Sequence, residues 1–120
     1  LRKAIGEKDQ LKAYKIIDYF AQNPKDNPLV VTTSLVFSFF SQLLQYHGTK
    51  DKNPNNLAKV LKVNPYFLKD YDVAFRNYPM KKVSQIVATL RDIDVKSKGV
   101  GANALPQSDL LKEMLIHIFR

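Results

Sequence analysis

The sequence predicts an all-α fold, a compact bundle of five to six helices that forms a single domain over residues 1–120. Three observations favour this. Apolar residues recur at intervals of three and four along most of the chain, Asn-Pro dipeptides divide it into helix-sized segments, and no segment alternates apolar and polar residues as a half-buried strand would. A length of 120 residues is sufficient for one hydrophobic core without disulfides or metals.

The most apolar segment, residues 28–48, contains no Lys, Arg, Asp or Glu, although 25% of the whole chain is charged. At 100° per residue its small polar side chains gather on one narrow stripe, and its apolar side chains cover most of the remaining circumference. This pattern predicts the central helix of the bundle. A transmembrane span is the competing interpretation by length, but seven Ser, Thr and Gln residues argue against it.

Asn-Pro occurs four times, at positions 23–24, 27–28, 53–54 and 64–65, and predicts helix starts. Asparagine is a good N-cap, and proline at the first helical position loses no hydrogen bond. Around the central helix we expect helices over residues 7–22, 54–61, 65–77, 78–96 and 106–119, with the end of another helix before Gly6 and a loop over residues 97–104. The expected core comprises Leu29, Val36, Phe37, Phe40, Leu43, Leu44, Phe67, Leu68, Tyr71, Ile86 and Leu90.

The residue content gives no support for catalysis. The absence of cysteine excludes disulfides, thiol nucleophiles and cysteine-based zinc sites, and is compatible with the cytoplasm, where we expect the protein. His47 and His117 lie on different expected helices without an acidic pair at metal-binding spacing, and no phosphate-binding G-x-x-x-x-G-K-[ST] loop occurs. We therefore expect no catalytic residue, no cofactor and no metal in this chain.

A net charge of +8 makes nucleic acid a candidate partner. Residues 55–78 resemble a helix-turn-helix, with Leu57, Ala58 and Leu61 in the first helix and Leu68 in the second. The second helix offers mainly aromatic side chains, lysine and two carboxylates, which form a poor surface for base recognition. A structural role is favoured, and a helix-turn-helix nucleic-acid-binding domain is the alternative.

The order of the segments resembles the C-terminal domain of the delta subunit of bacterial DNA polymerase III, the clamp-loader subunit. The resemblance covers nearly the whole chain and is carried by AIGEKDQLKAYKIIDYF before NPLVVTTSLVFSFFSQLLQY, by LAKVLKVNPYFLKDYDVAFRNYP, and by LRDIDVKSKG before DLLKEMLIHIF. The family's Asp-x-x-x-Lys stretch aligns either through Asp92 and Lys96 or through Asp94 and Lys98, and the loop VGANALPQS is longer than usual.

This resemblance implies an all-helical collar domain that supports loading of the sliding clamp in DNA replication. It implies packing beside the corresponding domains of gamma/tau-type and delta-prime-type subunits, within the DNA polymerase III holoenzyme. It also implies that the chain is the C-terminal fragment of a longer protein. The missing N-terminal part would include an ATPase-like module and the region that contacts the sliding clamp. The resemblance implies that this chain is involved with DNA only indirectly and that it does not bind a membrane.

Surplus apolar surface usually marks an interface, and the expected last helix has more of it than one side of a small bundle needs. Two candidate subunit interfaces follow from the sequence. One is formed by Leu111, Leu115, Ile116 and Phe119 of the last helix, and the other by the polar stripe of Ser34, Ser38 and Ser41 on the central helix.

Overall fold

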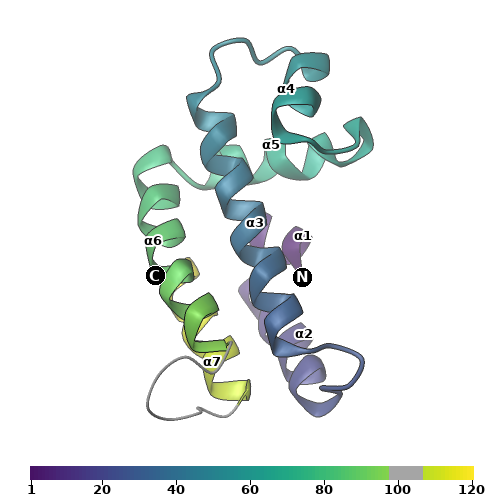
Figure 1. Ribbon diagram of the computed structural model, residues 1–120, viewed down its shortest axis with the longest axis vertical. Helices are drawn as coiled ribbons and strands as arrows, with labels where there is room; N and C mark the ends of the chain where they lie inside the picture. Colours follow the sequence, from purple (N-terminus) through teal and green to yellow (C-terminus); the bar gives the residue numbers. More distant parts are fainter. Residues whose placement is uncertain (98–106) are drawn as a thin grey trace.

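The computed structural model describes residues 1–97 and 107–120, and within them the chain is helical without any strand. The described elements are α1 (Arg2–Gly6), α2 (Gln10–Gln22), α3 (Leu29–Gly48), α4 (Pro54–Leu61), the short 3-10 helix η1 (Pro65–Phe67), α5 (Leu68–Asn77), α6 (Met80–Ser97) and α7 (Gln107–Phe119) (Figure 1). The predicted all-α fold is confirmed. The expected loop over residues 97–104 lies outside the described residues, apart from Ser97 at the end of α6.

The helix expected over residues 7–22 is shorter than predicted, because α1 and α2 are separated by a turn. Lys8 in this turn has a left-handed backbone with φ of 57°. Asp9 then caps α2, and its carboxylate accepts a hydrogen bond from the backbone N–H of Lys12 at 3.1 Å. The local cap at Asp9 therefore begins a new helix that the apolar spacing alone does not separate from the preceding turn.

The Asn-Pro dipeptides mark helix boundaries, though not always helix starts. Asn53 caps α4 and Asn64 caps η1, each through its side-chain oxygen. Pro28 itself is the N-cap of α3. Asn23, in contrast, is the C-cap of α2, so the first Asn-Pro ends a helix instead of beginning one.

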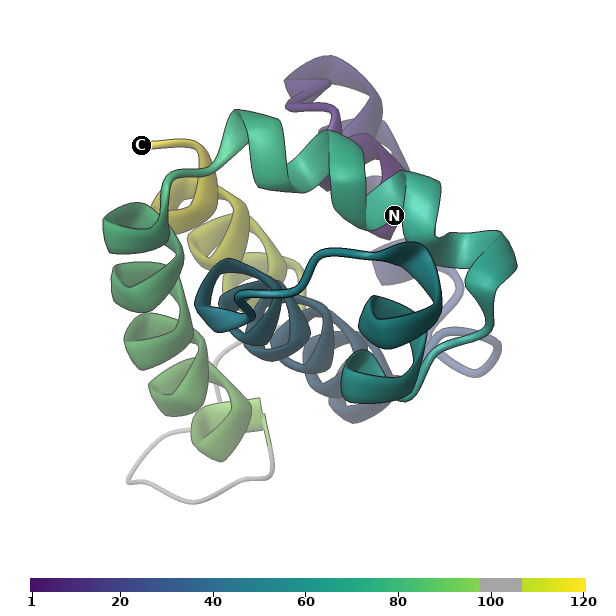
Figure 2. The ribbon, with the colours of Figure 1, turned by 90° about the horizontal axis from the view of Figure 1, so that it is seen from above.

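The central helix α3 packs along α6 and also contacts α4, α5 and α7 (Figure 2). Polar side chains fix its C-terminal half to the α4–α5 hairpin. Gln42 donates from Nε2 to the carbonyl oxygen of Leu61 at 2.8 Å, and the Tyr71 hydroxyl donates to Oε1 of Gln42 at 2.5 Å. The Tyr46 hydroxyl donates to the carboxylate of Asp72. Gln42 thus serves as both donor and acceptor inside one helix junction.

By length and composition alone, α3 could cross a membrane. Its buried side chains are those of Thr32, Thr33, Val36, Phe39, Phe40, Leu43 and Tyr46, which face the other helices. The core helix of a helical bundle passes the same test of length and hydropathy, and 39% of the apolar window of α3 is buried by the rest of the chain.

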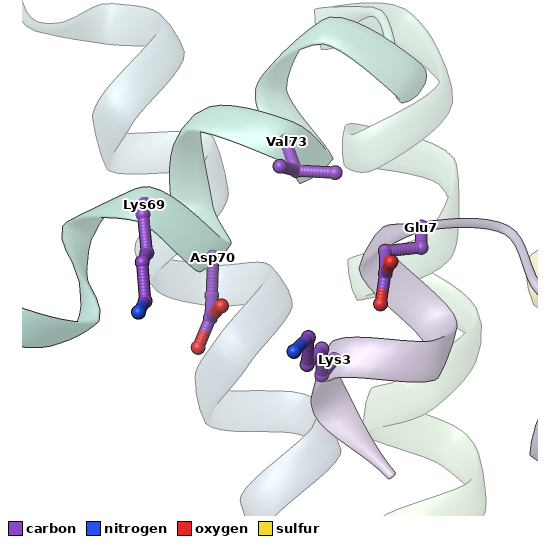
Figure 3. Close-up of a pocket in the computed structure, with 5 residues that line it drawn as sticks. All are labelled: Lys3, Glu7, Lys69, Asp70 and Val73. Atoms are coloured by element: carbon purple, nitrogen blue, oxygen red, sulfur yellow. The ribbon is translucent and has the colours of Figure 1, made fainter.

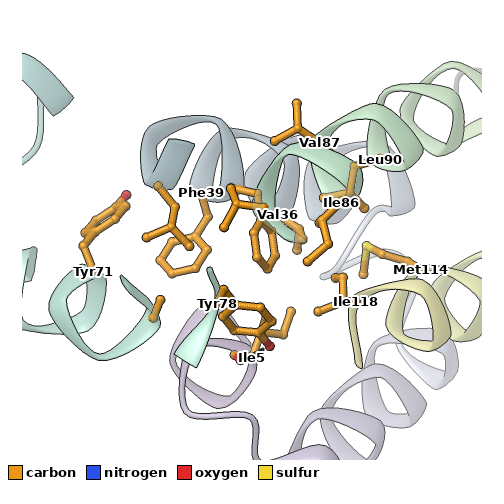
Figure 4. Packing of buried hydrophobic residues seen from close by; sticks show 14 of the residues in the cluster. Ile5, Val36, Phe39, Tyr71, Tyr78, Ile86, Val87, Leu90, Met114 and Ile118 are labelled. Carbon is orange, nitrogen blue, oxygen red and sulfur yellow. Dashed lines mark hydrogen bonds between the residues drawn. The ribbon is translucent and has the colours of Figure 1, made fainter. Parts of the chain in front are cut away.

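The hydrophobic core lies where α3, α5, α6 and α7 meet α1 (Figure 4). Of the residues expected there, Val36, Phe40, Leu43, Leu68, Tyr71, Ile86 and Leu90 are buried, and Leu29, Phe37 and Leu44 are half-buried against the core. Phe67 is a correction, because 42% of it is exposed. It belongs to η1, whose 3-10 geometry places Phe67 outside the helical repeat of α5, and its ring contacts the exposed Tyr66.

Helix α1 is held by side chains from the junction between α5 and α6. The Tyr78 hydroxyl donates to the carbonyl oxygen of Ile5 at 2.7 Å, and Asn77 Nδ2 donates to the carbonyl oxygen of Gly6 at 2.8 Å. Gly6 permits this close approach, since a Cβ atom at this position would lie 3.3 Å from Cβ of Ala74. The carbonyl groups at the end of a five-residue helix are thereby satisfied from a distant part of the chain.

Candidate subunit interface

The polar stripe predicted on α3 follows one side of that helix. Ser38 is exposed, and Ser34 and Ser41 are half-buried. Ser34 donates to the carboxylate of Asp94 on α6 at 3.2 Å. One turn further along α6, the hydroxyl of Ser97 shares a hydrogen bond of 3.0 Å with that of Thr33. The edge of the stripe that faces α6 therefore hydrogen-bonds to that helix, whereas Ser38 faces solvent.

Three aliphatic side chains on α3 flank this stripe and are exposed. The exposed fractions are 40% for Val30, 51% for Val31 and 52% for Leu35. At 100° per residue, Val30 lies on one edge of the serine stripe, and Val31 and Leu35 lie one turn apart on the other edge. We call Val30, Val31, Leu35 and Ser38 the outer face of α3. It carries no charge over its whole length.

A groove of about 200 Å³ lies beside the outer face. It runs between the start of α3, the end of α2 and the first residues of the chain, and its lining includes Leu1, Arg2, Phe20, Asp26, Val31 and Leu35. Apolar side chains form its walls, and one cation and one carboxylate are available for orientation. Apolar surface combined with a few polar groups is the usual make-up of a protein-binding surface.

Val30, Val31 and Leu35 were not predicted from the sequence as interface residues. Their exposure depends on which neighbours reach the first half of α3, and α4 and α5 cover only the second half. One sequence signal was available. Val30 and Val31 lie two and three positions after the polar NPKDNP segment, and Leu35 lies one helical turn after Val31.

The candidate interface on α7 requires a correction. Leu111 and Leu115 have no exposed surface, because α7 packs against α2, α6 and α3. Only the outer residues of the predicted set remain accessible. Ile116 is 50% exposed, and Phe119 is half-buried with its ring 6.4 Å from that of Tyr14 on α2. The apolar surplus of α7 is therefore used largely inside this chain.

The acidic residues near the end of α6 also join helices together. Asp94 is half-buried and accepts from Ser34, whereas Asp92 is exposed. Lys96 lies 3.6 Å from the carboxylate of Glu113 on α7. Lys98, of the alignment through Asp94, lies outside the described residues.

A family model described as the C-terminal domain of the DNA polymerase III delta subunit matches residues 1–117. The chain belongs to this family. A curated relative, the probable DNA polymerase III subunit delta of Mycoplasma genitalium, is 30% identical over 120 residues. The match includes 99% of this chain and 38% of the relative, so the delta-family chain spans less than two fifths of that protein. No solved structure matches the chain.

Hollows also occur elsewhere on the delta-family chain. One of about 200 Å³ lies between α1 and α5 and is lined by Lys3, Glu7, Lys69, Asp70 and Val73 (Figure 3). Two of its lining side chains are positively charged and two are negatively charged. The lining contains no nucleophile with an adjacent base. Within residues 1–97 and 107–120, no group of three or more His, Cys, Asp or Glu side chains could hold a metal ion.

Proposed function

We propose that this chain is an oligomerisation domain of the collar type, which joins gamma/tau-type and delta-prime-type subunits in a clamp loader that serves DNA replication in the cytoplasm. Membership of the delta-subunit family supports this assignment. Contact with the sliding clamp is assigned to other parts of the protein.

One observation carries the proposal. The outer face of α3 exposes three aliphatic side chains on a helix with no charged residue, whereas solvent-facing helix surfaces are normally rich in charge. Small side chains such as Ser38 between them let another helix approach closely. We infer that the outer face of α3 and the adjoining groove contact a neighbouring subunit.

The test is Leu35→Lys in the protein that contains this chain, mixed with gamma/tau-type and delta-prime-type subunits. Native mass spectrometry and analytical gel filtration measure the assembled complex. We expect loss of the complex with an unchanged circular dichroism spectrum and melting temperature, because Leu35 is half exposed.

Leu11→Lys is the matched control, since Leu11 is an even more exposed leucine, at 69%, on α2. It should assemble normally. Full assembly of the Leu35 variant, or equal loss with the Leu11 control, would remove the outer face of α3 as the interface.

A further inference from the structure

A separate cleft of about 440 Å³ lies at the other end of α3, where the central helix meets the α4–α5 hairpin. Its lining includes Tyr46 of α3, Lys52 of the following connection, Leu57 of α4, and Leu68, Asp72 and Arg76 of α5. Tyr46 lies eleven positions after Leu35, which is roughly 16 Å along a helix at 1.5 Å per residue. The cleft is therefore distinct from the proposed subunit interface.

The cleft combines an apolar floor with a charged rim. Leu57 and Leu68 are 3% and 7% exposed and form the floor. Lys52 and Arg76 are exposed at the rim, and Asp72 is half-buried between the rim and the floor. The surrounding segment adds to the positive charge, because Lys50, Lys52, Lys59 and Lys62 are opposed there by Asp51 alone.

The polar groups of the cleft are held in place by neighbouring groups. The Tyr46 hydroxyl donates to one oxygen of Asp72, and burial together with this hydrogen bond raises the pKa of Tyr46 to about 12. Lys52 donates to the carbonyl oxygen of Thr49 at 2.6 Å, with its ammonium 5.6 Å from the centre of the Phe75 ring. Arg76 Nε donates to the carbonyl oxygen of Asp72 at 3.3 Å.

We propose that this cleft binds an acidic peptide segment of a partner protein, with a leucine-sized side chain on the Leu57–Leu68 floor and carboxylates at Lys52 and Arg76. A carboxylate has about four acceptor sites, so Asp72 can accept a backbone N–H from the peptide while it accepts from Tyr46. Three features of one cleft thus match three groups of one ligand class: the apolar side chain, the backbone N–H and the acidic side chain.

The same geometry disfavours a nucleic-acid strand. Tyr46 and His47 lie with ring centres 4.5 and 4.4 Å from that of Phe75, and Lys52 covers this ring as well, so Phe75 is occupied and offers no platform for a base. A sugar-phosphate backbone has no N–H for Asp72, whereas a peptide backbone offers one at each residue other than proline. The hydrogen-bonding groups of the cleft therefore suit a peptide better than DNA.

The test uses fluorescence anisotropy at low salt with the protein and a peptide of sequence Glu-Asp-Leu-Glu-Asp that carries fluorescein on its N-terminal amine and an amide at its C-terminus. We expect binding that weakens at least about tenfold in Arg76→Glu, because hydrogen bonds between charged groups are the strong ones. Lys25→Glu makes the same charge change in the exposed loop before α3 and should weaken binding less than about twofold. Circular dichroism checks that both variants are folded.

Two further binding measurements distinguish a peptide from other ligands. A peptide with serine in place of leucine should bind at least about tenfold more weakly, because it loses the apolar contact. A twelve-residue oligothymidylate should compete poorly. The proposal would be overturned if the peptide did not bind or if the Arg76 and Lys25 variants weakened binding equally. It would also be overturned if the serine peptide bound as tightly or if the oligonucleotide bound more tightly than the peptide. Leu35→Lys should leave peptide binding unchanged and Arg76→Glu should leave subunit assembly unchanged, so the two proposals fail separately.

Discussion

Helices α3 and α7 are the most apolar of the longer described helices, yet they differ in how much of their apolar surface the rest of the chain covers. On α7, Leu110, Leu111, Met114, Leu115 and Ile118 are all 2% exposed or less. On α3, the longer and more apolar helix, Val30, Val31 and Leu35 remain 40% or more exposed. The apolar content of a helix therefore does not determine how much of it is covered. The number and position of neighbouring helices determine that.

The two halves of α3 repeat this contrast on a smaller scale. The second half is fixed by Gln42 and Tyr46 to the α4–α5 hairpin. The first half has α6 on one side and its outer face on the other. One continuous helix thus combines a part that stabilises this chain with a part that is available to another chain.

The largest expected effect on stability comes from truncating α7. Leu115→Ala should lower the free energy of unfolding by about 2–5 kcal/mol, since the removed side chain is fully buried and leaves a cavity. Urea denaturation measures it. Ile116→Ala, the adjacent and half-exposed position, is the control and should change stability by less than about 1 kcal/mol. Similar losses in both variants would mean that α7 is not enclosed as described.

The second effect concerns the fixed half of α3. Gln42→Ala removes the hydrogen bonds that Gln42 makes with the Leu61 carbonyl and the Tyr71 hydroxyl, which should cost roughly 1–3 kcal/mol of unfolding free energy. Ser38→Ala on the outer face should cost less than about 0.5 kcal/mol. If chemical denaturation shows no difference between the two variants, the junction of α3 with the hairpin contributes no more than the exposed face does.

A smaller effect depends on pH. The folded-state pKa of Tyr46 is raised to about 12, above the ordinary value of 10.0, so its neutral form favours the folded state. This contribution is complete below pH 10 and is lost as the pH rises towards 12. Tyr46→Phe should therefore flatten the fall in melting temperature between these pH values. Tyr19→Phe, at a 58% exposed tyrosine, is the control and should retain the wild-type slope.

The smallest effect on stability is expected from Ile116→Lys, which adds a charge at the exposed side of α7. Stability should change by no more than about 0.5 kcal/mol, and the clamp-loader complex should assemble as with the unchanged chain. Native mass spectrometry of the variant mixed with the gamma/tau-type and delta-prime-type subunits measures the assembly. Loss of the complex would return α7 to the interface and weaken the contrast between the two helices.

Much of the secondary structure follows from local signals. The bounds of α4 are those expected from the sequence, because Asn53 and Pro54 form a standard helix start and the chain leaves the helix at Lys62. The end of a helix at Gly6 was expected, but α2 begins at Gln10 and not at residue 7, because Asp9 is its N-cap and the apolar spacing does not mark this cap. Phe67 was misplaced for a related reason, since a three-residue 3-10 helix has a different repeat from the helix that follows.

By itself, the sequence determined that the chain is helical, which segments form most of its helices, and that α3 carries a polar stripe with Ser34, Ser38 and Ser41. Only the tertiary structure decided that Leu111 and Leu115 are core residues and that Val30, Val31 and Leu35 are exposed. The physical reason is the range of the interactions. Caps and helical periodicity act within a few residues, whereas the burial of an apolar side chain depends on helices that arrive from distant parts of the chain.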